Sequence, residues 1–180
     1  MTTATLPSEA APGATAFIGL GANLGDARAT LGDALTALRS LALPGSFAAS
    51  SLYGSAPIDS SGPDYVNAVA RLRTTLAPHA LLDALQAIEQ RFGRERPYRN
   101  APRTLDLDVL LFGVEGDAGG VVLDDERLAV PHPRAAQRGF VLEPLAELWP
   151  GGEIPGAGCV ADLLAAARRD PGQRVHRLDV

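Results

Sequence analysis

The chain contains no lysine, so that its 16 permanently cationic side chains are all arginines. A P-loop requires a lysine before its final serine or threonine, and the absence of lysine therefore excludes that class of nucleotide site. Any side chain that contacts phosphate in this protein is expected to be an arginine or a histidine, unless a bound metal ion makes the contact.

Cysteine, aromatic residues and long apolar runs are also scarce. Cys159 is the only cysteine, but 180 residues are enough to bury a core without disulfides or structural zinc. No run of eighteen apolar residues occurs, and no segment typical of a signal peptide opens the sequence. A net charge of −5 with 5% aromatic residues argues against nucleic-acid binding. We therefore expect a cytoplasmic protein without a membrane or nucleic-acid partner, and we expect it to be a monomer.

The composition changes near residue 13. Residues 1–13 are rich in Thr, Ala, Pro and Ser and lack hydrophobic periodicity, which predicts a disordered N-terminal tail. Residues 14–180 show no repeat and no second boundary, so we expect a single domain there. A glycine-rich turn spans 19–25, but Leu24 stands where a dinucleotide-binding fingerprint needs its third glycine, and we do not favour a Rossmann fold.

Hydrophobic periodicity and turn residues predict alternating strands and helices. Strands are expected at 14–21, 47–53, 65–76, 105–112, 121–123 and 175–180, and helices at 26–42, 78–93, 140–148 and 160–169. Asp26 and Pro78 are typical of helix starts, whereas Pro144 should break the third helix. The order β-α-β-β-α-β predicts a ferredoxin-like α+β sandwich, in which a mostly antiparallel sheet has its helices on one main face, with C-terminal additions.

Two carboxylates lie in the strand predicted at 105–112. Side chains alternate along a strand, so that Asp106 and Asp108 fall on one face, about 6.6 Å apart, and the apolar residues around them on the other. Like charges this close at the edge of a core need compensation. Five arginines come just before them: Arg91, Arg94, Arg96, Arg99 and Arg103. The arginines could offset the carboxylates directly, or divalent cations and a polyphosphate could join the two groups, which is the interpretation we favour.

Three other polar positions are less informative on spacing alone. Gln86 and Glu89 share one side of the second predicted helix, beside its apolar stripe, and we interpret them as a solvated helix edge. A lone histidine is more often structural than functional, but His132 lies between two prolines that fix its backbone and precedes Arg134 and Arg138. His132 is therefore a candidate site residue.

Several motifs, in order along the chain, resemble those of the 6-hydroxymethyl-7,8-dihydropterin pyrophosphokinase family. The motif at 99–110 reads Arg-x-Ala-Pro-Arg-Thr-Leu-Asp-Leu-Asp-Val-Leu. The supporting motifs are Gly-Ala-Asn-Leu at 21–24, Asp-Tyr-Val-Asn-Ala at 64–68, Gln-x-x-Glu at 86–89, Gly-Arg-x-Arg at 93–96, Val-Pro-His at 130–132 and Arg-Gly-Phe at 138–140. The resemblance implies a ferredoxin-like fold, two Mg²⁺ ions and transfer of pyrophosphate from ATP to the hydroxymethyl group of a reduced pterin, releasing AMP, in folate biosynthesis.

By this resemblance the site residues fall into three groups. The catalytic candidates, of which the two carboxylates would also hold the metal ions, are Arg94, Arg103, Asp106 and Asp108. The candidates for contact with ATP are Gln86, Glu89, Arg96, Arg127, His132 and Arg138. The pterin slot would be formed by Ser55, Ala56, Ile58, Tyr65, Asn67 and Phe140. Asp106 could also accept the hydroxyl proton, although metal activation could make a dedicated base unnecessary.

Two interpretations from other classes remain open. A nucleotide-binding regulatory module on the same sandwich would keep the arginines but would need no carboxylate pair. A purely structural protein would use Asp106, Asp108 and the arginines as a salt-bridge network. Formation of AMP from ATP in the presence of the pterin separates the enzyme from both.

Overall fold

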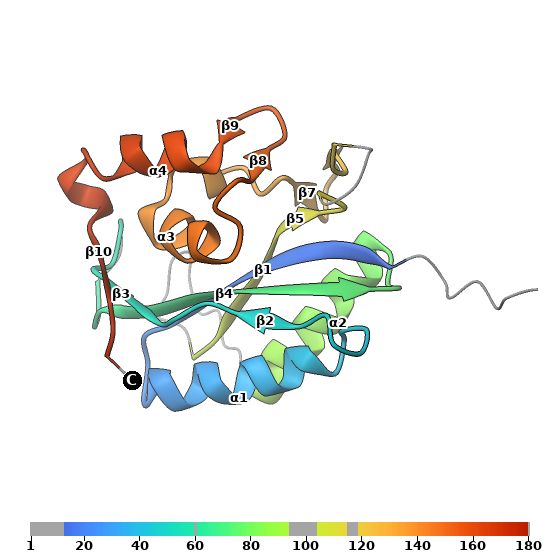
Figure 1. Ribbon diagram of the computed structural model, residues 1–180. Helices are drawn as coiled ribbons and strands as arrows, with labels where there is room; N and C mark the ends of the chain where they lie inside the picture. Colours follow the sequence, from blue (N-terminus) through green and yellow to red (C-terminus); the bar gives the residue numbers. More distant parts are fainter. Residues whose placement is uncertain (1–12, 60, 94–103, 115–118, 180) are drawn as a thin grey trace, which may run out of the picture.

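The computed structural model describes residues 13–59, 61–93, 104–114 and 119–179 (Figure 1). Of the tail predicted at 1–13, only Gly13 lies within these ranges. None of the helices in the described ranges combines the length and apolar character needed to cross a membrane.

A six-stranded sheet forms the centre of the fold. Its strands are β1 (Ala14–Ala22), β2 (Ala48–Ala49), β3 (Tyr53–Ser55), β4 (Tyr65–Thr74), β5 (Asp106–Phe112) and β10 (Val175–Arg177). The order is β10-β3-β4-β1-β5, with β2 pairing a further part of β4. Every pair is antiparallel, which confirms the predicted kind of sheet and leaves β10 and β5 as its two edges.

The remaining elements are helices and two small hairpins. The helices are α1 (Ala27–Arg39), α2 (Pro78–Arg91), α3 (Gly139–Leu148) and α4 (Val160–Ala167), with 3-10 turns η1 (Ala135–Gln137) and η2 (Pro171–Gln173). The hairpins join β6 (Leu123–Asp124) to β7 (Ala129–Val130), and β8 (Glu153–Ile154) to β9 (Gly158–Cys159).

Helices cover both faces of the sheet (Figure 1). Helices α1 and α2 pack on one face, where Ile18 of β1 is fully buried, and α3 and α4 pack on the other, where Phe17 of β1 is fully buried. The two helices of the predicted β-α-β-β-α-β order, α1 and α2, therefore share one face, and α3 and α4, which follow that order in the chain, cover the other. Neighbouring residues of β1 and β5 are apolar, so that both faces of these strands need a cover from water.

Helix starts follow the prediction more closely than helix interiors and ends. The Asp26 carboxylate accepts the Ala29 N–H at 3.0 Å and caps α1, and Pro78 is the first residue of α2. Helix α1 ends at Arg39, three residues earlier than predicted. Helix α3 continues through Pro144, so the predicted break is wrong; burial of the Pro144 ring offsets the backbone hydrogen bond that proline cannot donate.

The strand predicted at 47–53 is two short strands, β2 and β3. Ala49 pairs with Ala70 but Tyr53 pairs with Asn67, so that four steps along one strand face three along β4. The extra residue is taken up near Ser50, whose hydroxyl accepts the Val69 N–H at 3.0 Å in place of a backbone carbonyl. This irregularity behaves as a β-bulge and explains why a continuous strand does not form. The strand predicted at 121–123 is displaced to β6.

Candidate active site

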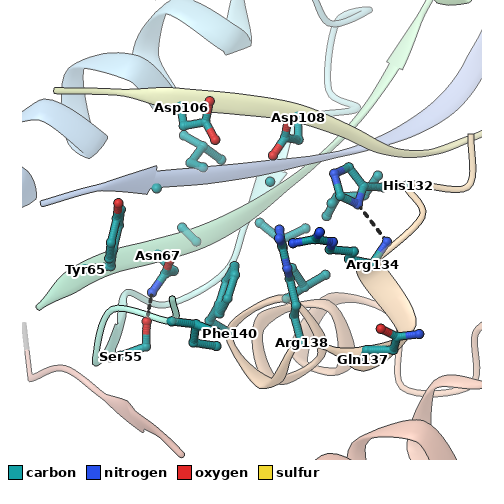
Figure 2. Close-up of a pocket in the computed structure, with 18 of the residues that line it drawn as sticks. Ser55, Tyr65, Asn67, Asp106, Asp108, His132, Arg134, Gln137, Arg138 and Phe140 are labelled. Carbon is teal, nitrogen blue, oxygen red and sulfur yellow. Dashed lines mark hydrogen bonds between the residues drawn. The ribbon is translucent and has the colours of Figure 1, made fainter. Parts of the chain in front are cut away.

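A pocket of about 500 Å³ lies on the face of the sheet that carries α3 (Figure 2). Strands β1, β4 and β5 form its floor, and β3 with the loop that follows forms one wall. The other wall comes from the segment 132–141 and from Gln173. Residues from both ends of the described chain therefore meet in one cavity.

Two glycines of β1, Gly19 and Gly21, lie at the centre of the floor. In the register of the sheet, Gly21 lies between Asp106 of β5 and Asn67 of β4, and Gly19 lies between Asp108 and Val69. Directly opposed residues of antiparallel strands point to the same face. The two carboxylates and Asn67 therefore lie around Gly21 on one face of the sheet, where a Cβ would be 3.5 Å from Oδ1 of Asn67. The Leu110 side chain lies over Gly19, 3.2 Å from the place where a Cβ would be.

The six residues predicted to form the pterin slot all line this pocket: Ser55, Ala56, Ile58, Tyr65, Asn67 and Phe140. Buried Asn67 is held by its amide nitrogen, which donates to Ser55 Oγ at 2.9 Å and to the Tyr53 carbonyl at 3.3 Å. A carbonyl can only accept, so the amide nitrogen must face Tyr53. The Asn67 oxygen is thereby turned toward the floor, where it can accept a hydrogen bond from a ligand.

Charges of both signs enter the pocket from opposite sides. Asp106 and Asp108 point into it from β5, while the guanidinium groups of Arg134, before η1, and Arg138, before α3, extend toward them (Figure 2). The Arg138 guanidinium carbon also lies 5.4 Å from the centroid of the Phe140 ring, a cation–π distance. The arrangement can bind a ligand that carries both anionic groups and bound cations.

His132 is held in one orientation at the edge of this charged region. Its backbone N–H donates to the Leu110 carbonyl at 2.8 Å, and its Nδ1 accepts the Arg134 N–H at 3.1 Å. Burial, followed by the positive charge of Arg138, lowers the pKa of His132 below its ordinary value of 6.5, and the opposing charge of Asp106 does not restore it. At neutral pH the ring is therefore uncharged and carries its proton on Nε2.

We predict that His132 makes the fold less stable in mildly acidic solution. Its folded pKa lies below the ordinary value of 6.5, so the unfolded chain binds the proton first as the pH falls. The free energy of unfolding then decreases. When the pH is lowered from about 7.5 to about 5.5, the Tm of His132→Asn should therefore fall less than the Tm of the wild type. His176→Asn, at an exposed position, controls for the loss of an imidazole; equal losses in His132→Asn and the wild type would contradict the prediction.

The carboxylate pair fits a hard divalent cation such as Mg²⁺. Asp106 and Asp108 are partly buried oxygen donors on one face of β5 and both line the pocket. Mg²⁺ commonly takes one or two carboxylates and completes its shell with water and substrate phosphate oxygens. The described residues contain no group of three or more His, Cys, Asp or Glu suited to a metal, so a cation at these two residues would share its shell with such oxygens.

Glu89 lies behind β5 and is not solvated. It is 1% exposed, and its Oε1 accepts the Leu107 N–H at 2.9 Å. Leu107 lies between Asp106 and Asp108 on β5, and among the described residues no strand pairs with β5 on the side away from β1. The interpretation as a solvated helix edge is therefore wrong for Glu89, whose carboxylate instead holds the backbone between the two acidic residues.

We predict that Glu89→Ala lowers the free energy of unfolding by about 2–3 kcal/mol, because the Leu107 N–H loses a charged acceptor in a buried place. Urea denaturation measures the change. Glu89→Gln keeps an oxygen acceptor and should lose less, and Gln90→Ala, at the exposed neighbouring position, is the control. A fully stable Glu89→Ala variant would mean that β5 does not depend on this bond.

Three of the residues assigned to ATP by resemblance do not line the pocket: Gln86, Glu89 and Arg127. Arg127 instead forms an ion pair with Asp83 of α2, beside a contact of 2.8 Å between His79 and Asp125. His132 and Arg138 do line the pocket. The remaining predicted arginines, Arg94, Arg96 and Arg103, lie outside the described residues, as does Arg99.

Some residues that line the pocket were not predicted as site residues from the sequence. Arg134 and Gln137 lie in sequence between His132 and Arg138, so that a site spanning those two residues could have suggested them. The alternating Gly19 and Gly21 in a predicted strand could have indicated a close approach of a ligand to the backbone. Gln173 follows no motif, and only the fold brings it to the pocket.

The sequence matches a known family over most of its length. Residues 17–150 match the model of the family described as 7,8-dihydro-6-hydroxymethylpterin-pyrophosphokinase (HPPK). A 2-amino-4-hydroxy-6-hydroxymethyldihydropteridine pyrophosphokinase of Pseudomonas aeruginosa is 45% identical over 163 residues, which cover 90% of this chain and 95% of the relative. An enzyme of the same name from Haemophilus influenzae is 41% identical over 151 residues, 83% of this chain and 91% of the relative.

The fold is similar to crystal structures of Plasmodium falciparum HPPK-DHPS. The wild type with STZ-DHP gives a TM-score of 0.69 at 13% identity and covers 96% of this chain, and the wild type with SDX-DHP gives 0.65 at 14% and covers 88%. This chain spans 48% and 45% of those two, about half their length, and the likeness shows the fold alone. From the family match and the curated relatives, the chain belongs to the HPPK family, ATP-dependent enzymes that transfer pyrophosphate to 6-hydroxymethyl-7,8-dihydropterin in folate biosynthesis.

Proposed function

We propose that this transfer takes place in the pocket on the α3 face, with the reduced pterin beside Asn67 and the triphosphate between the carboxylates and the arginines. One observation carries the proposal: a carboxylate pair and an oriented amide flank the glycines of β1 in a single cavity. A carboxylate pair suits cation-bound phosphate, and an amide suits a heterocycle with donors and acceptors.

The pterin end of the pocket supports binding of a flat polar ring. The Asn67 oxygen is an acceptor for a ring N–H, and Tyr65 and Phe140 supply aromatic surfaces. Ser55 fixes the Asn67 amide, and Ala56 and Ile58 form the apolar rim. In this proposal the hydroxymethyl group of the pterin lies on the side of Asp106.

The phosphate end supports binding of a polyanion. Arg138 and neutral His132 are donors that face the carboxylate side, and Arg134 adds charge. Arg94 and Arg103, with Arg96, are assigned by resemblance to the charge that develops on the transferred group and to the triphosphate. Arg127, also assigned to ATP by resemblance, would have to exchange its contact with Asp83 for the nucleotide. Gln86 and Glu89 would flank the nucleotide only from outside the pocket lining.

The reaction itself requires one displacement. The hydroxymethyl oxygen attacks the β-phosphorus of ATP, the bond from that phosphorus to the oxygen bridging the α-phosphate breaks, and AMP leaves with that oxygen. The hydroxyl proton passes to Asp106 or to solvent. We propose that Asp106 and Asp108 hold two Mg²⁺ ions, which when bound neutralise charge on the phosphate oxygens and lower the pKa of the attacking hydroxyl.

We also propose that the fold is built on a ferredoxin-like core. The order β5-β1-β4-β3 with crossovers through α1 and α2 supports a ferredoxin-like β-α-β-β-α-β core, to which the segments from α3 onward are C-terminal additions. On this view residues 14–180 are one domain of a monomeric, cytoplasmic enzyme.

The proposal is tested with the purified protein, ATP, Mg²⁺ and 6-hydroxymethyl-7,8-dihydropterin, with nucleotides separated by chromatography. AMP should form only when the pterin is present, in equal amount to a pterin diphosphate. A regulatory nucleotide-binding module would bind ATP without forming AMP, and a structural protein would do neither. Formation of ADP instead would show transfer of the γ-phosphate and would contradict the assignment.

A further inference from the structure

Helix α3 lacks a side-chain cap of its own although its first residues line the pocket. The N-cap residue is Arg138, which forms no capping hydrogen bond through its side chain. The first N–H groups of a helix have no partner within the helix and need one elsewhere. Arg138 and Phe140 both line the pocket, so any fraying at this helix start would move them.

The missing acceptor comes from the C-terminal part of the chain. The Gly139 N–H donates to Oε1 of Gln173 at 3.0 Å, across 34 residues of sequence. Gln173 lies beyond residue 150, where the family match ends, and itself lines the pocket. The bond therefore ties a segment outside the family match to the wall of the active site.

The backbones at this contact are also fitted closely. A Cβ built on Gly139 would lie 2.3 Å from the carbonyl oxygen of Gln173 and 3.2 Å from Cγ2 of Val175. Real Cβ atoms do not approach a carbonyl oxygen so closely, so only glycine allows the two segments to meet as they do. The approach brings the Gln173 side chain within reach of the helix start.

The residues before and after Gln173 in the sequence hold its backbone in place. Before it, the Asp170 carboxylate accepts the Gly172 N–H at 2.8 Å and the Asp170 carbonyl accepts the Gln173 N–H at 3.0 Å. After it, Val175 of β10 pairs with Ser55 of β3, the residue whose hydroxyl accepts from Asn67. One short segment thus contacts both walls of the pocket.

We infer that Gln173 is a positioning residue for the transfer: its side-chain oxygen is the N-terminal cap of α3 and keeps Arg138 and Phe140 in the pocket. The inference rests on the proposed function, because it takes those two side chains to bind the substrates. Without the cap, the first turn of α3 opens more often and both side chains spend less time in the binding geometry, whereas the carboxylates of β5 are unaffected.

Two replacements separate the capping oxygen from the rest of the side chain. Gln173→Leu keeps a similar volume and removes the acceptor. Gln173→Glu keeps an acceptor, and a carboxylate near a helix N-terminus is favourable. Arg174→Ala changes the exposed neighbouring residue and is the matched control.

The kinetic result expected for Gln173→Leu is a rise of about five- to tenfold in KM for both substrates, with kcat within about twofold of wild type. Gln173→Glu should return the KM for the pterin to within about twofold of wild type. A role in stability alone would instead reduce the amount of folded enzyme, which lowers the apparent kcat and leaves KM unchanged. Unchanged KM values in Gln173→Leu therefore overturn the inference.

Amide hydrogen exchange at Gly139 gives a readout that does not depend on turnover. Exchange should be about tenfold or more faster in Gln173→Leu than in wild type and close to wild type in Gln173→Glu and Arg174→Ala. Equal exchange in all four proteins overturns the capping role even if activity changes. A wild-type protein that forms no AMP refutes the proposed function, and the positioning role falls with it; wild-type activity with an unaffected Gln173→Leu refutes the positioning role alone.

Discussion

Replacement of either Asp106 or Asp108 by alanine is expected to abolish turnover, by at least about 10³-fold in kcat, with little loss of fold. Each change removes one of the two oxygen donors that suit Mg²⁺. It also relieves the repulsion between two carboxylates that share one face of β5. Without Mg²⁺ the Tm should therefore hold or rise, as is common where charges are kept close for function rather than for stability.

The measurements are AMP formation at saturating substrates and thermal melts with and without Mg²⁺. Asp124→Ala removes an exposed carboxylate from β6, away from the pocket lining, and should retain activity. Mg²⁺ should raise the Tm of the wild type in the presence of nucleotide but not that of the two pocket variants. Wild-type turnover in either Asp variant would exclude the two-metal assignment.

Replacement of Asn67 by leucine is expected to reduce kcat/KM for the pterin by about 100-fold, mainly through KM. Leucine has a similar size but offers neither an acceptor to the ligand nor a donor to Ser55 Oγ and the Tyr53 carbonyl. A pocket built around a hydrogen bond discriminates strongly when that bond is lost, because the ligand group is then desolvated without a partner.

Ser55→Ala is the graded control for this prediction. It removes one of the two partners that orient the Asn67 amide and leaves the amide itself, so that KM should rise only about three- to fivefold. Direct titration of the pterin against both variants separates binding from chemistry. Unaltered pterin affinity in Asn67→Leu, together with a lower Tm, would mean that Asn67 only links β3 to β4.

The alternation of side chains correctly predicted that Asp106 and Asp108 share one face of a strand. Asp106 and Asp108 in one strand and Tyr65 and Asn67 in another fall on the same face because period-two patterns fix which side chains share a side, and hydrogen-bonded register then brings them together. Tyr65 and Asn67 of the predicted pterin slot line the pocket for this reason. Ala56 and Ile58 come from the loop after β3 and Phe140 from α3, and the roles of all these residues rest on resemblance.

The burial of a side chain and its contacts with residues far away in sequence could not be predicted from this periodicity. Helical spacing places Glu89 on a side of α2, but whether that side meets solvent or an edge strand depends on where β5 lies. The break near Ser50 depends on a hydroxyl replacing a carbonyl opposite Val69, and local propensity does not report such a choice. Gln173 meets Gly139 only because α3, η2 and β10 return to the same corner of the fold.

The absence of a side chain at Gly21 has a consequence for the entropy of binding. A ligand that settles on side chains must restrict their rotamers, which opposes association by about 0.5–1.5 kcal/mol for each flexible side chain. A flat ring lying over Gly21 meets peptide groups that the sheet has already fixed on both sides, because β1 is paired with β4 and with β5. At Gly21 the floor contributes contact surface with no side-chain freedom to lose, which favours a thin, rigid ligand at this point.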